Sequence, residues 1–187
     1  MNEKAQASIE FMFLISIAMI YIATVVMPAV EISKVAAEDV TQLAQTRMAA
    51  EKLVNAIDSV AAASGDAKQT VTIFVPARGA IECLNCSDPK NPSPTTCSGV
   101  IATSSGNVVM FEFLLTKVNQ NVVLEHRLCQ EAVSGGKACK KYFVTSSVFY
   151  CSDASRIGNP AMDSATTKEV AIQKTAGRID VIIPSTT

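Results

Sequence analysis

The sequence contains little charge, few aromatic residues and almost no histidine. Its 187 residues include no tryptophan and a single histidine, and aromatic residues make up 5% of the chain. Charged residues make up only 18%, and 16 basic residues nearly balance 17 acidic ones. A net charge of −1 does not provide the basic surface that nucleic acid requires, so we expect no nucleic-acid partner. The length suits one domain, or one domain with an appendage.

Candidate catalytic residues are also scarce. His126 lies between Glu125 and Arg127 in an alternating run, which favours a structural place in a strand over the role of a catalytic base. A Ser/His/Asp triad would have to use this histidine. The stretch Ser134-Gly135-Gly136-Lys137 lacks the spacing of a phosphate-binding P-loop. We therefore predict that the protein is not an enzyme and uses no cofactor.

The prominent feature that is present is one long apolar run near the N-terminus. Residues 11–30 contain 17 hydrophobic residues and no charge, with Ser16, Thr24 and Pro28 as the exceptions. A helix of this length spans about 30 Å, which matches the hydrocarbon core of a bilayer. A cleaved secretory signal has an apolar core of about 7–15 residues followed by a small-residue cleavage site. No such site follows this run, which therefore predicts a retained membrane-spanning helix.

A short motif stands directly before the apolar run. Gln6-Ala7-Ser8-Ile9-Glu10-Phe11 follows a polar leader that ends in Lys4-Ala5. This pattern, Q-x-S-x-E-F before an apolar helix, resembles the class III signal peptide of archaeal type IV pilins. The resemblance covers residues 4–60 as motif plus helix, and beyond them it rests on layout alone. It implies a structural subunit of an archaeal pilus-like filament that serves adhesion or surface attachment.

The resemblance also implies roles for the residues of the motif. A membrane-embedded prepilin peptidase would cut between Ala5 and Gln6 and leave a mature chain of 182 residues. Glu10, with Phe11 beside it, would then serve assembly, because the wider family uses this Glu to neutralise the N-terminal amine of a neighbouring subunit. A buried ammonium and a buried carboxylate stabilise each other, since either alone is costly. The alternative for Glu10 is a place at the headgroups, where a carboxylate stabilises the helix N-terminus.

The expected location follows from the charges around the run. Lys4 and the N-terminal amine precede it, and the positive-inside rule keeps that end cytoplasmic. Residues 31–187 would face outside and carry 15 acidic and 15 basic residues. The precursor would cross the cytoplasmic membrane once, and the pilus assembly machinery would then build a helical homo-oligomer at the cell surface. The alternatives are a minor pilin and a monomeric membrane-anchored extracellular binding protein.

The apolar helix is predicted to continue as an amphipathic helix. From Ala36 to Ala61, positions three or four residues apart form one stripe that is apolar except at Arg47. Gly65 is the expected C-terminal cap. Pro28 is the expected site of a kink or of local unwinding.

The remainder of the chain has the pattern of strands and turns. Alternating apolar residues predict strands with one wet face, at residues 70–75, 107–115, 122–128, 142–144, 148–150, 169–174 and 178–183. The expected fold class is α+β, with a long N-terminal α-helix packed on a C-terminal antiparallel β-sheet or small β-sandwich head. The predicted division is a leader at 1–5, an apolar helix at 6–30, an amphipathic helix at 31–65 and a head at 66–187.

The cysteines all lie in the predicted head: Cys83, Cys86, Cys97, Cys129, Cys139 and Cys151. An even number in a small extracytoplasmic domain favours disulfides, although the sequence leaves their pairing open. A Cys129–Cys139 bridge is the first expectation. Cys83 or Cys86 would join Cys97 across a proline-rich loop, and Cys151 would take the remaining partner. The rival interpretation is zinc binding at the C-x-x-C pair of residues 83–86, but a second such pair is missing.

Two smaller signals concern the surface of the head. Asn85-Cys86-Ser87 matches the N-glycosylation pattern, and a bridge at Cys86 would hinder glycan addition at Asn85. Lys137, Lys140 and Lys141 form a basic cluster in the sequence. This cluster is interpreted as a solvated surface, with an anion-binding patch as the alternative.

Overall fold

The chain has an α+β fold, which confirms the predicted class. The computed structural model describes residues 3–93, 95–99, 105–116, 131–133, 138–152 and 156–184. One long helical stretch precedes a nine-stranded, mostly antiparallel sheet. The chain divides into two compact units, Met1–Val40 and Thr41–Thr187. The division falls inside a helix, so the helical residues from Thr41 onward belong to the same unit as the sheet.

The N-terminal unit is helical through the whole apolar run. It contains α1 (Glu3–Tyr21), a π-helical turn η1 (Ile22–Val26) and the start of α2 (Met27–Ala62). In the π turn the Met27 N–H donates to the Ile22 carbonyl, five residues back. Pro28 follows at once, and a proline in a helix lacks the N–H that would bond to the preceding turn. In place of a kink or unwinding at Pro28 itself, the structure has the π-helical turn η1 just before it, and the chain is helical on both sides of this turn.

The second unit contains all nine strands of the described residues. They are β1 (Ala67–Val75), β2 (Gly79–Cys86), β3 (Cys97–Gly99), β4 (Ser105–Leu114), β5 (Glu131–Val133), β6 (Ala138–Ser152), β7 (Arg156–Gly158), β8 (Thr166–Thr175) and β9 (Arg178–Ile182). Their order is β1-β8-β9-β6-β4-β2-β3, with β5 paired to β6 and β7 paired to β2. Among these described strands, the one parallel pairing joins residues 150–152 of β6 to residues 180–182 of β9.

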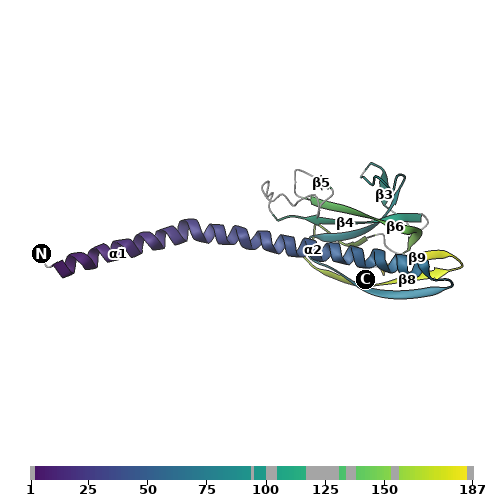
Figure 1. The fold of residues 1–187 in the computed structure, drawn as a ribbon, viewed down its shortest axis with the longest axis horizontal. Coiled ribbons are helices and arrows are strands. Elements are labelled where there is room, and N and C mark those ends of the chain that lie inside the picture. The colour runs from purple at the N-terminus through teal and green to yellow at the C-terminus, as the bar shows by residue number, and fades with distance from the viewer. Residues whose placement is uncertain are drawn as a thin grey trace. The chain divides into compact units, whose positions relative to one another are not determined.

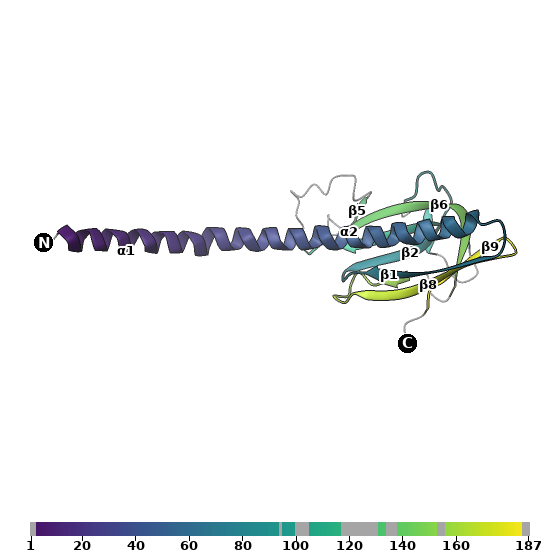
Figure 2. The same cartoon turned by 60° about the horizontal axis from the view of Figure 1, so that its bottom comes forward.

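The sheet curves around the distal part of α2. Strands β4 and β6 lie on one side of this helix, and β8 lies on the other (Figure 1); Figure 2 shows the same head turned, with β1, β2 and β8 beside the helix. The short β6–β9 pairing connects the two halves. The core therefore combines side chains of the helix with side chains of both halves, including Leu43, Leu53, Ile57, Ile73, Phe111, Phe113, Phe149, Ile172 and Val181.

Side chains of α2 form hydrogen bonds with backbone groups of strands β1 and β6. Lys52 Nζ donates to the Thr72 carbonyl of the edge strand β1 at 2.8 Å. Asp58 Oδ1 accepts from the Ser146 N–H of β6 at 2.9 Å and from the Ser146 hydroxyl at 2.6 Å. Ser146 lies where β6 departs from its register with β4. The helix thus supplies hydrogen-bond partners to the edge strand β1 and to the irregular part of β6.

The predicted helix cap at Gly65 is wrong. Gly65 does not adopt a positive φ, which a left-handed C-terminal cap requires. The helix ends at Ala62, and its final carbonyls are bound by a side chain of β8 instead. Lys174 Nζ donates to the Ala61 and Ala63 carbonyls at 2.8 and 2.6 Å. A cation at this end also complements the helix dipole.

Several strand predictions differ from the structure. The segments 142–144 and 148–150 belong to the single strand β6, because the irregular residues between them remain part of it. Strand β2 has no counterpart in the prediction. Most of its side chains are buried on both faces, so it lacks the alternation by which a half-exposed strand is recognised. The segment 122–128 lies outside the described residues.

Candidate functional sites

The apolar side chains of the N-terminal unit are exposed within the single chain. Phe11 and Leu14 are 63% and 66% exposed, and the large apolar residues from there to Ile32 are similarly uncovered. The most apolar 18-residue window of the helix has a mean hydropathy of 2.3, and none of it is buried. Contact of such a surface with water is unfavourable by roughly 25 cal/mol per Å². This helix is long and apolar enough to anchor the chain in a membrane.

The hydroxyl groups in this segment bond within the helix itself. Ser16 Oγ donates to the Met12 carbonyl at 2.9 Å, and Thr24 Oγ1 donates to the Ile20 carbonyl at 2.7 Å. A hydroxyl that is satisfied in this way can enter an apolar environment at small cost. The segment is therefore suited to surroundings of lipid or of other apolar helices.

The residues of the predicted processing and assembly sites lie at the beginning of this surface. Ala5 and Gln6 are within α1. Glu10 is exposed, and Phe11 next to it is the first exposed large apolar side chain among those whose burial the structure describes. The motif thus stands on a helix, directly before the apolar surface.

Two disulfides stabilise the sheet. Cys83–Cys151 joins β2 to the end of β6, and Cys86–Cys97 joins β2 to β3. The second is one of the two pairings expected across the proline-rich loop, and Cys151 takes the remaining partner, as expected. Cys139 is also disulfide-bonded. Cys129, its predicted partner, lies outside the described residues, so that pairing stays a prediction.

The zinc alternative for the C-x-x-C pair is wrong. Cys83 and Cys86 are both oxidised, and each is bridged to a cysteine outside the pair. Their side chains point to opposite faces of β2: Cys83 belongs to the main core, and Cys86 belongs to a smaller cluster with Leu84, Val108, Met110 and Tyr142. Alternation along a strand therefore sends the two sulfur atoms to different partners.

The neighbouring lysines of β6 do not form a common cluster. Lys140 pairs with Glu112 at 3.4 Å, and the same carboxylate pairs with Arg156 at 2.8 Å. Lys141 lies over the ring of Phe143, 5.7 Å from its centroid. Burial lowers the pKa of Lys141; nearby Arg47 lowers it further, and Glu51 opposes both. Successive strand residues face opposite sides, and Lys137 lies outside the described residues.

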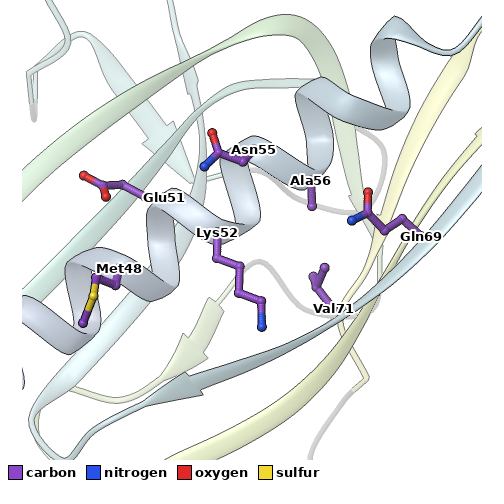
Figure 3. A pocket seen from close by; sticks show the side chains of 7 residues that line it. All are labelled: Met48, Glu51, Lys52, Asn55, Ala56, Gln69 and Val71. Carbon is purple, nitrogen blue, oxygen red and sulfur yellow. The ribbon is translucent and has the colours of Figure 1, made fainter.

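A shallow groove runs between α2 and the edge strand β1 (Figure 3). Its volume is about 370 Å³, which is in the range of small-ligand sites. The amides of Asn55 and Gln69 come from the helix and the strand respectively, and Ala56 and Val71 supply an apolar surface. Met48, Glu51 and Lys52 complete the lining. These side chains offer hydrogen-bonding and charged groups beside an apolar surface.

Metal-binding potential is low in the part of the chain that the structure describes. No group of three or more His, Cys, Asp or Glu side chains there could hold a metal ion. His126 lies outside that part. No protein-family model, no curated protein and no solved structure matches this chain.

Sequence reasoning missed the groove and the helix side chains that bond to the sheet. Lys52, Asn55 and Asp58 appear in the sequence only as polar positions beside the apolar stripe. The hydrogen-bond partners of Lys52 and Asp58 are 20 and 88 residues away in the chain, and Asn55 lines the groove with strand residues, so no local pattern could reveal these arrangements.

Proposed function

We propose that the protein is a structural subunit of an archaeal type IV pilus-like filament, held in the membrane by its N-terminal helix before assembly. The observation that supports this most directly is the combination in one chain of a processing motif, an uncovered apolar helix and a disulfide-bonded head. The apolar surface begins right after the motif and none of its most apolar window is buried. A single copy therefore leaves this surface uncovered, and lipid first and other copies later would cover it.

The steps follow from the chemistry of the segment. Cleavage before Gln6 creates a new N-terminal amine four residues before Glu10. In a filament core these groups would neutralise each other between neighbouring copies, because a lone charge in an apolar environment is costly. Small residues, namely Ala18, Ala23, Thr24 and Ala29, allow close approach of helices. Transfer from membrane to filament then exchanges lipid contacts for contacts between helices.

The head is suited to an extracytoplasmic location. Disulfides persist in oxidising compartments and are rare in the cytosol, and the described cysteines are all bridged. In the proposed filament the heads would form the outer layer and make contact with surfaces or other cells.

A second candidate function is a monomeric membrane-anchored extracellular binding protein. It is favoured by the groove between α2 and β1, which offers two amides, the Glu51 carboxylate and the Lys52 ammonium beside an apolar surface. A minor pilin that primes assembly would use the same helix, and its abundance would distinguish it from a major subunit.

The first experiment is mass spectrometry of the N-terminus of the chain isolated from its native cells. We expect the mature chain to begin at Gln6, and to retain Met1 when the prepilin peptidase gene is deleted. An intact Met1 in normal membranes would contradict the filament proposal and favour the anchored binding protein.

The replacement Glu10→Gln separates membrane insertion from assembly. We expect the variant to insert into the membrane as the wild type does, because a neutral amide is easier to accommodate there. Filament yield should fall strongly, because the new amine would lose its counter-charge. Fractionation and electron microscopy measure the two outcomes. Glu31→Gln is the matched control, since Glu31 is an exposed acidic residue of the same helical stretch, at the start of α2 and outside the motif. Normal filaments from Glu10→Gln would show that the pairing role is wrong.

A further inference from the structure

The glycosylation motif Asn85-Cys86-Ser87 occupies an unusual position in the head. Its first two residues end strand β2, and its third begins the loop to β3. The Asn85 side chain is exposed, Cys86 is buried and bridged to Cys97, and Ser87 is exposed. The nearby Asn91-Pro92-Ser93 has a proline in the middle position, which excludes it as an acceptor. An attached glycan at Asn85 would therefore project into solvent from the folded head.

The backbone of the motif is held at every residue. Asn85 pairs with Ser98 in the β2–β3 ladder. The Asn107 side chain bonds to both the N–H and the carbonyl of Cys86, each at 2.8 Å. The Ser87 N–H and hydroxyl both donate to the Thr96 carbonyl, at 2.9 and 3.2 Å. The motif is thus fixed in a strand, with a disulfide at its centre.

This arrangement conflicts with the chemistry of glycan transfer. A transferase that modifies the Asn85 amide and recognises the Ser87 hydroxyl must bind both residues at once. In the folded head the Ser87 hydroxyl is bonded to Thr96 and the peptide between the two residues is bonded to Asn107. Release of this segment would require loss of these hydrogen bonds, and the Cys86–Cys97 bridge would still hold residues 86–97 in a closed loop. The motif is accessible only before that loop closes.

We propose that Asn85 is an N-glycan acceptor whose occupancy is set by competition between glycan transfer and formation of the Cys86–Cys97 disulfide. The donor is an oligosaccharide linked to a membrane lipid through phosphate. A bond forms between Asn85 Nδ2 and the anomeric carbon as the bond from that carbon to the phosphate oxygen breaks. The amide proton passes to a base of the transferase, and the lipid phosphate leaves. The inference rests on the extracytoplasmic location of the head in the proposed function.

The test compares cysteine variants of the full chain in its native cells, with glycan occupancy of the Asn85 peptide measured by mass spectrometry. Cys97→Ser removes the bridge and leaves the motif intact, so occupancy should rise severalfold over that of the wild type. Cys86→Ser also keeps an acceptor pattern and should give the same rise. Cys151→Ser is the matched control, because it removes the other bridge of β2 and should leave occupancy near the wild-type level. Ser87→Ala should abolish it.

Two results would overturn the proposal: an unmodified Asn85 in every variant, or equal occupancy in Cys97→Ser and Cys151→Ser. Poor folding of a variant does not obscure the outcome, because the proposed transfer precedes folding of the loop. The N-terminal peptide of the same digest reports separately whether the chain begins at Gln6. Failure of this inference is thus distinguishable from failure of the proposed filament function.

Discussion

The double variant Cys83→Ala/Cys151→Ala should lose about 4 kcal/mol of the free energy of unfolding, by the chain-entropy estimate for a loop of this size. The bridge closes a sequence separation of 68 residues, and a longer loop leaves more freedom to the unfolded chain once the bridge is removed. Both cysteines are almost fully buried, at 1% and 2% exposure. The bridge also joins β2 to the residues of β6 that pair with β9, where the two halves of the sheet connect.

The variant Cys86→Ala/Cys97→Ala is the matched comparison. Its bridge closes a separation of 11 residues, for which the same estimate is about 3 kcal/mol. Urea unfolding of the full chain in detergent, followed by circular dichroism, measures both losses. Equal losses, or a larger loss for the Cys86–Cys97 pair, would show that loop length and core position do not determine the stabilisation.

The replacement Gly158→Ala should lower the free energy of unfolding by about 3–5 kcal/mol, through backbone strain and a direct clash. Gly158 has a φ of +79°, and an added Cβ would lie 2.6 Å from the Gly79 carbonyl oxygen. Gly79 has no room to withdraw, because its own Cβ position lies 2.8 Å from Thr46 Oγ1 of α2. Strand β7 therefore approaches β2, and β2 approaches α2, at places where only glycine fits.

The control for this prediction is Gly177→Ala. Gly177 has a φ of +82°, and nothing lies within 4 Å of its Cβ position. The Gly177→Ala variant should lose about 1–2 kcal/mol of the free energy of unfolding, because alanine is strained in this left-handed backbone conformation. Thermal or urea unfolding of the two variants measures the difference, which isolates the clash from the strain. Similar losses in both variants would mean that the head can shift β7 away from β2.

Much of the architecture could be predicted from local patterns. The uncharged run at 11–30 and the stripe from Ala36 to Ala61 both depend on residues close together in the chain, and the structure is helical through both. The final strands at 169–174 and 178–183 alternate regularly and correspond to β8 and β9. The predictions for these elements agree with the structure because apolar residues have a characteristic spacing in a helix and in a half-exposed strand.

The sequence-based predictions differ from the structure where burial or helix capping depends on residues that are distant in the chain. Strand β2 was not predicted because it is buried on both faces, so its sequence lacks the alternation of apolar and polar residues that a half-exposed strand shows. Gly65 was the obvious local cap, yet Lys174, 111 residues from Ala63, binds the helix end. Lys140 and Lys141 are neighbours in the sequence and suggested one basic cluster. In strand β6 their side chains face opposite sides, so Lys140 contacts Glu112 and Lys141 contacts Phe143.

The order of residues along the chain is enough to predict an apolar helix of membrane length, a motif before it and a cysteine-rich β head. These properties depend on the order of residues over short distances, where periodicity and charge decide the outcome. The pairing of the cysteines, the curvature of the sheet around α2 and the place of Asn85 beside a closed disulfide loop follow from the folded structure. Each of these depends on the register between strands, and register is set by contacts between residues that are far apart in the chain.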